Sequence, residues 1–173
     1  MEWYKKVNMD AKAAFYLTLS EKILDKLTPY DDWYPLIRRS MNFCWEWVEE
    51  KKYDSYDIYY ELADEDEGFY VISTLEGVFQ DDFQAESVYW CVFFAVSYTL
   101  KQALIFENKE LHGPQELEQV NDETTYIQFM EEIKKVNGYQ EEWPERLKQY
   151  LLENYPAGSD KKIKREELLK LIA

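Results

Sequence analysis

The chain has 173 residues, of which 46% are hydrophobic and 17% aromatic, and its formal net charge is −15. This length fits one domain that buries roughly 70% of its unfolded surface, and the aromatic content exceeds that of a disordered acidic chain. The negative charge excludes a general affinity for nucleic-acid phosphates and for anionic membranes.

Three further features favour a reduced, cytoplasmic protein. The longest charge-free run, Ser87 to Leu100, is shorter than the about 20 apolar residues that a membrane span needs. The first residues lack the basic start and apolar stretch of a signal peptide. Cys44 and Cys91 lie far apart in apolar helical contexts, so two buried thiols are expected in place of a disulfide.

The first 50 residues predict two helices. Apolar residues at every fourth position indicate a helix that ends at about Leu27, before Thr28-Pro29. The second helix carries Pro35 in its first turn and an apolar face from Leu36 to Val48. The candidate N-caps are Asn8 or Asp10 for the first helix and Asp31 or Asp32 for the second.

The segment from 53 to 83 has a weaker pattern. Its tyrosines indicate a short helix from Asp57 to Leu62. Residues 69–74 have the composition of a strand, but no convincing second strand exists to pair with it. A short helix is therefore the preferred interpretation of 69–74, and a strand is the alternative.

Residues 86–106 predict the central helix of the fold. The run from Val88 to Val96 is apolar on every side, and a helix of that kind must be surrounded by other elements. We therefore expect an all-α, single multihelical domain packed around this helix, with little or no sheet.

Two more helices and a basic tail are expected after it. His112, the only histidine, lies in a polar segment next to a Gly-Pro pair and is expected in an exposed loop. Asn121 or Asp122 caps one helix, and Trp143-Pro144 opens another that ends before Pro156. The predicted division is a helical domain over 1–156, with a linker and a basic helix or tail over 157–173.

Familiar catalytic and metal-binding patterns are missing from the sequence. The glycines are too dispersed for a dinucleotide fingerprint or a phosphate-binding loop, and the cysteines lack zinc-site spacing. A calcium loop that began at Asp64 would place Leu75 where the bidentate glutamate belongs, so a solvated turn is expected there. No cofactor and no metal are predicted.

Negative charge is concentrated in one part of the chain. From Tyr53 to Leu100 the sequence has eleven carboxylates and no lysine or arginine. Like charges repel within a Debye length of about 8 Å, so the clustering opposes folding. The patch either binds a basic partner, with tyrosines as anchors, or is a solvated face without a partner. The candidate partner-binding residues are Asp54, Tyr56, Asp57, Tyr60, Glu61, Asp64, Glu65, Asp66, Glu67, Asp81 and Asp82.

The order of several short motifs over 9–155 resembles a family of helical immunity proteins from bacterial polymorphic-toxin and contact-dependent-inhibition systems, the sixth in the usual numbering. The motifs are Asp10-Ala11-Lys12-Ala13-Ala14-Phe15, Cys44-Trp45-Glu46-Trp47, Tyr59-Tyr60-Glu61-Leu62, Trp90-Cys91, Ser97-Tyr98-Thr99, Glu141-Glu142-Trp143 and Leu151-Leu152-Glu153-Asn154-Tyr155. The resemblance implies a cytoplasmic, non-enzymatic protein that binds the C-terminal domain of a cognate toxin. Such toxins are often nucleases with basic grooves.

Two alternatives to the immunity function stay open at this point. One is an enzyme that uses carboxylates and a divalent metal, because acids from distant helices can meet in a fold. The other is a structural adaptor that forms a homodimer through exposed aromatic residues.

Overall fold

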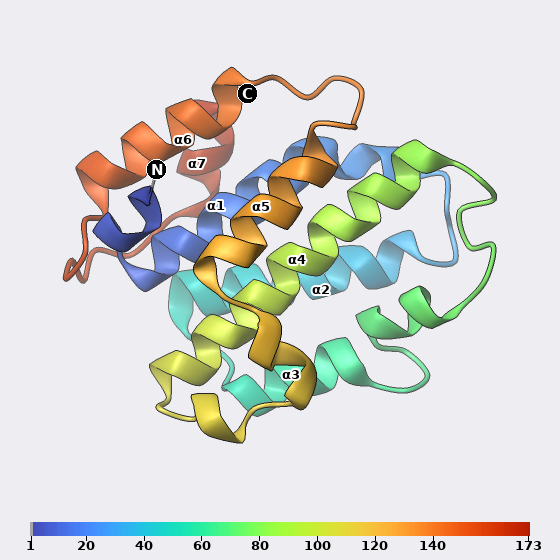
Figure 1. Cartoon of the computed structure of the whole chain (residues 1–173), viewed down its shortest axis with the longest axis horizontal. Coiled ribbons are helices and arrows are strands. Elements are labelled where there is room, and N and C mark those ends of the chain that lie inside the picture. Colours follow the sequence, from blue (N-terminus) through green and yellow to red (C-terminus); the bar gives the residue numbers. More distant parts are fainter. Residues whose placement is uncertain (1) are drawn as a thin grey trace.

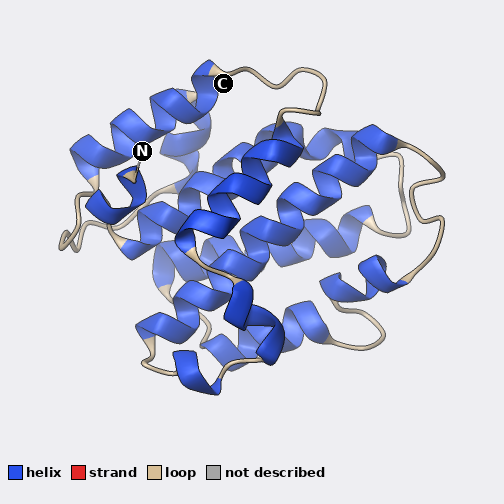
Figure 2. Cartoon of the chain, in the orientation of Figure 1, coloured by secondary structure: helices blue, strands red, loops and turns tan. Residues whose placement is uncertain are grey.

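The computed structural model describes residues 2–173, and over that range its regular elements are helices, with no strand (Figure 2). The α-helices are α1 (Met9–Ile23), α2 (Tyr34–Glu50), α3 (Ser55–Ala63), α4 (Phe83–Phe106), α5 (Asp122–Ile133), α6 (Glu142–Asn154) and α7 (Arg165–Leu171). The 3-10 helices are η1 (Trp3–Lys6), η2 (Leu24–Leu27), η3 (Phe69–Thr74), η4 (Glu110–His112) and η5 (Gln115–Gln119). The predicted all-α fold is confirmed.

Helix α4 runs through the middle of the molecule and packs against α1, α2, α3 and α5 (Figure 1). Its length and its mean hydropathy of 1.3 would suit a membrane span, but 78% of its most apolar 18-residue stretch is buried by the rest of the fold. Trp90, Phe93 and Phe94 are only half-buried, so one side of the helix is less covered than the sequence predicts. The helix is nevertheless the centre of the core.

Side-chain caps decide where several helices begin. The Asn8 side chain accepts a hydrogen bond from the Ala11 amide at 2.8 Å and starts α1. Asp82 does the same for the Ala85 amide at 3.1 Å, so α4 begins at Phe83, three residues before the predicted start at Glu86. The carboxylate supplies the acceptor that the first free amides of a helix need.

The predicted cap of α2 is wrong. Neither Asp31 nor Asp32 occupies that position, and Trp33 precedes the helix without a side-chain bond. The carbonyl of Tyr30 accepts hydrogen bonds from the amides of Trp33 and Tyr34, so a backbone turn leads directly into the helix. The proline in the first turn fits without cost, because its missing N–H has no partner there in any case.

Residues 69–74 form the short helix η3, as preferred over a strand. Phe69 and Ile72 are buried, and the Phe69 ring stacks on Tyr89 of α4 with centroids 4.9 Å apart. The hydroxyls of Ser73 and Thr74 donate hydrogen bonds to carbonyls three residues earlier, both at 2.7 Å. These local bonds replace the cross-strand partner that the sequence does not provide.

The C-terminal segment lies on α1 and α6. Helix α7 contacts both helices and buries Leu168, and Ile163 and Ile172 on either side of it are buried too. Near the start of the segment, Val7 and Pro156 form an antiparallel bridge that ties it to the N-terminal residues. The proposed division of the chain at residue 156 stays a prediction.

A buried carboxylate joins this segment to the core. Glu21 of α1, whose side chain is 8% exposed, accepts hydrogen bonds from Arg38 at 2.8 Å and from Arg165 at 2.6 Å. The indole N–H of Trp45 donates to the same carboxylate at 3.2 Å. One acid on α1 therefore connects two side chains of α2 with the first residue of α7.

Candidate functional site

Two acids of the predicted site shape helix α3 itself. Asp54 accepts a hydrogen bond from the Asp57 amide at 2.8 Å, and Asp57 accepts one from the Asp54 amide at 3.2 Å. This reciprocal pair is a capping box, which satisfies two amides at the helix N-terminus. Both carboxylates stabilise α3 as well as adding charge to it.

The predicted acidic turn follows at the other end of α3. Asp64 accepts hydrogen bonds from the amides of Asp66 at 2.9 Å and Glu67 at 2.8 Å. These two bonds, from Glu67 first, lower the pKa of Asp64 below its ordinary value and keep it ionised. Gly68 closes the turn, where a Cβ would come within 2.5 Å of the Asp64 backbone. The turn leaves the side chains of Glu65, Asp66 and Glu67 exposed.

Most of this charge is not compensated within the fold. Of the eleven carboxylates between residues 53 and 100, Glu61 alone has an ion-pair partner among residues 2–173. That partner is Arg39 of α2, at 2.6 Å, which also donates to the carbonyl of Glu67 at 3.0 Å. A basic residue 22 positions earlier thus neutralises part of the patch, which the local sequence does not reveal.

Three tyrosines of α3 are exposed to solvent. The exposed fractions of Tyr56, Tyr59 and Tyr60 are 68%, 39% and 60%, and the rings of Tyr56 and Tyr60 stack with centroids 6.5 Å apart. Large apolar rings in water are a feature of interaction surfaces when they cluster. We call this region the acidic-aromatic face. It consists of Asp54, Tyr56, Asp57, Tyr59, Tyr60, Glu61, Asp64, Glu65, Asp66 and Glu67.

Two aromatic residues beside this face, one on α2 and one in the loop after it, were not indicated by the sequence pattern. Phe43 and Tyr53 stack with centroids 3.7 Å apart and line a shallow hollow with Tyr56 and Tyr60. The Tyr53 hydroxyl donates to Glu46 at 2.8 Å, and this bond raises the pKa of Tyr53. Phe43 lies on α2, but its partner Tyr53 comes from the loop after the helix. Periodicity alone does not find such a pair.

Asp81 and Asp82 are not part of the acidic-aromatic face. They precede α4 at its upper-right end in Figure 1, whereas α3 lies at the bottom of that view. Asp82 accepts a hydrogen bond from the Tyr30 hydroxyl at 2.7 Å, and this bond lowers its pKa. Its other oxygen caps α4. Asp82 therefore stabilises the fold, and the structure separates these two acids from the other candidates.

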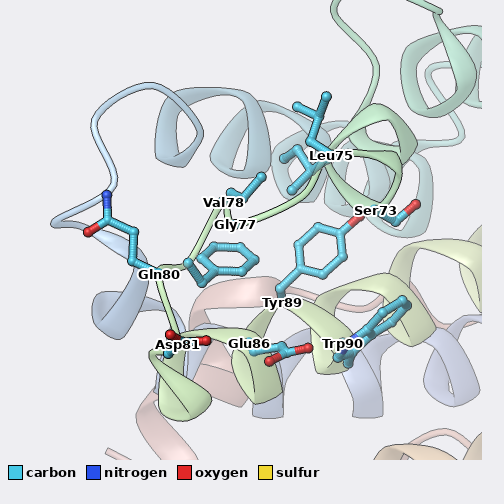
Figure 3. A pocket seen from close by; sticks show the side chains of 11 residues that line it. Ser73, Leu75, Gly77, Val78, Gln80, Asp81, Glu86, Tyr89 and Trp90 are labelled. Carbon is cyan, nitrogen blue, oxygen red and sulfur yellow. The ribbon is translucent and has the colours of Figure 1, made fainter.

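A small hollow of about 190 Å³ lies next to Asp81, between the 75–82 loop and α4 (Figure 3). The buried Tyr89 ring crosses it, with Trp90 to one side, and the carboxylates of Asp81 and Glu86 lie along its lower edge in the figure. Gln80 and Asp81 both have positive φ angles, of 50° and 67°, which L-residues rarely adopt. Aromatic rings beside carboxylates are groups that contact cationic side chains.

Metal-binding geometry is not found in the part of the chain that the structure describes: no three His, Cys, Asp or Glu side chains converge on one point. His112 is exposed, as predicted, but it ends the short 3-10 helix η4 and does not lie in a loop. Both cysteines are unpaired and buried, which confirms the expected thiols.

Comparison with known proteins identifies the family. The model of the family described as "Immunity protein Imm6" matches residues 11–136. The chain belongs to this immunity protein family. The match confirms the sequence resemblance and includes most of α1 and all of α2 to α5, so the acidic-aromatic face lies inside the family region of this Imm6 protein. No curated protein and no solved structure matches the chain.

Proposed function

We propose that this Imm6 protein protects its cell by binding a toxin domain, with the acidic-aromatic face placed on a basic surface of that domain. The observation that carries the proposal is the combination on α3 and its turn of exposed, unpaired carboxylates with three exposed tyrosines. Membership of an immunity family supplies the kind of partner, and the face supplies its charge.

Charge and aromatic rings have separate roles in this proposal. Carboxylates attract a basic surface at long range and raise the association rate, an effect that salt screens over about 8 Å. Once water leaves the interface, tyrosine rings bury a large rigid area at low entropic cost and act as anchors. Tyr56 and Tyr60 have the exposure that this role requires.

A nuclease is the toxin class that this face suits best. Grooves that bind nucleic acid are basic, and a row of carboxylates can occupy the place of the phosphates and exclude the substrate. The protein would then act in the cytoplasm by occupying the toxin and would need no bond-making chemistry of its own. Its partner is the C-terminal toxin domain encoded by a neighbouring gene.

Charge reversal tests the proposal. Glu65, Asp66 and Glu67 are the best positions, because their side chains are exposed and no hydrogen bond or ion pair in the structure depends on them. Asp57 and Asp64 serve less well, because their carboxylates hold the cap and the turn. The triple change to lysine should slow association with the toxin domain encoded by the neighbouring gene at least tenfold at low salt.

The matched control reverses Glu131, Glu141 and Asp160, which are exposed, lie outside the face, and likewise make no side-chain hydrogen bond or ion pair in the structure. Both triple variants raise the net charge by six, so a general charge effect would slow them equally. The proposal requires the control to associate within about twofold of the parent protein. If both variants associate equally fast, the acidic-aromatic face is not the binding surface.

A further inference from the structure

An apolar pocket of about 310 Å³ lies between α3, η3, α4 and η5. Its walls include Ala63 of α3, Tyr70 of η3, Phe93 and Leu100 of α4, and Val120, which follows η5. The volume is at the lower end of the roughly 300–1,000 Å³ that ligand pockets span. It is therefore large enough for a single side chain or a small molecule.

Four hydroxyl groups in the pocket wall are already hydrogen-bonded within the fold. The Tyr70 and Ser97 hydroxyls bond to each other at 2.7 Å. Those of Ser73 and Thr74 donate to backbone carbonyls of η3 at 2.7 Å each. Three of these four hydroxyls thus donate within the fold, and the carbon surface of the rings and aliphatic groups makes up most of the wall that an occupant would contact. Such a pocket favours an apolar occupant over a hydrogen-bonding one.

The pocket is continuous with the acidic-aromatic face. Tyr59 and Ala63 line it, and the same two residues line the neighbouring hollow formed with Asp64, Glu65 and Asp66. Glu116 adds a carboxylate from η5 on the opposite wall. An apolar side chain in the pocket would therefore have carboxylates on both sides of its backbone.

We propose that the pocket receives one apolar side chain, of leucine or phenylalanine size, from a lysine- or arginine-rich segment on the surface of the toxin. The inference rests on the proposed function, because it names the chemistry of the partner at the same face. Carboxylates at the rim pair with the flanking cations, and the desolvated pocket supplies most of the affinity. This is the usual division between the centre and the rim of an interface.

Two peptides test the pocket without the toxin: acetyl-Lys-Lys-Phe-Lys-Lys-amide and the same peptide with serine in place of phenylalanine. The phenylalanine peptide should bind at least about tenfold more tightly, which corresponds to the burial of one aromatic ring. In amide NMR spectra it should shift the signals of Ala63, Thr74 and Val120, whereas the serine peptide should shift only those of the acidic turn. Equal affinities with identical shifts would overturn the inference.

Filled-pocket variants supply the second measurement. Ala63→Phe and Val120→Phe each place a ring in the pocket from a different wall, so their agreement does not depend on how either one folds. Both should bring the affinity ratio of the two peptides to about one. Ala157→Phe, at an exposed position between α6 and α7, is the control and should leave the ratio unchanged.

Binding measurements with the toxin domain encoded by the neighbouring gene distinguish a failure of this inference from a failure of the proposed function. If the filled variants bind it as well as the parent while the reversal at 65–67 slows association, the pocket inference is wrong and the face is correct. If the filled variants bind at least tenfold more weakly, the pocket is an anchor site. If the parent protein does not bind the domain, the proposed function fails, and the peptide ratio still decides the chemistry of the pocket.

Discussion

Replacement of Glu21 with alanine tests whether one buried carboxylate holds the C-terminal helix on the core. The change leaves the guanidinium groups of Arg38 and Arg165 and the indole N–H of Trp45 without their shared acceptor. Loss of one partner of a buried ion pair costs about 3–5 kcal/mol. The side chains of Arg38 and Arg165 are 29% and 26% exposed, so water compensates in part, and we expect the lower end, about 3 kcal/mol.

Urea unfolding followed by circular dichroism measures this loss, with Arg165→Ala and the double variant completing a thermodynamic cycle. Arg165→Ala alone should cost about 2 kcal/mol, and the double variant should cost less than the sum by about 1 kcal/mol. Glu166→Ala is the control, because Glu166 pairs with Lys170 on the exposed side of α7. A loss below about 0.5 kcal/mol for Glu21→Ala, or strict additivity, would refute the reasoning.

Two further predictions follow from burial. Burial raises the pKa of Cys44 to about 12 and also raises the pKa of Cys91. Neither thiol should therefore react with Ellman's reagent at pH 8 until urea unfolds the chain. Fast labelling of the native protein would contradict this prediction. Burial also raises the pKa of Tyr30 and Tyr139 to about 12. Their contribution to stability is therefore complete below about pH 10 and lost as the pH approaches 12. The urea concentration at the unfolding midpoint should therefore decrease as the pH is raised from 9 to 11.5. An unchanged urea midpoint over this pH range would contradict the prediction.

Helix order could be read from the sequence because buried stripes repeat with the helical period. The apolar run of α4 identifies the central element, and the stripe of α2 identifies a surface that packs on it. Helix starts were less predictable. Asp82 caps α4 and Trp33 precedes α2, because the choice among neighbouring polar residues depends on the turn that leads into each helix.

The candidate site was predictable only where it is local in sequence. Tyr56 and Tyr60 stand one turn apart on α3, so their common exposure follows from helical spacing. Three features depend on tertiary packing and left no sequence pattern: the ion pair of Arg39 with Glu61, the separation of Asp81 and Asp82 from α3, and the apolar pocket beside Ala63. Each is set by how elements far apart in the chain are placed relative to one another.

The bridge between Val7 and Pro156 has a practical consequence for handling the protein. Backbone hydrogen bonds flank it: the Asn8 amide donates to the carbonyl of Tyr155, and the Ala157 amide donates to that of Lys6. These bonds hold the N-terminal residues against the start of the C-terminal segment. Both labelled ends lie in the upper left half of Figure 1, across the molecule from α3. A purification tag, a fluorophore or a sensor-chip tether fused at either end would therefore leave the tyrosines of α3 free to meet a partner.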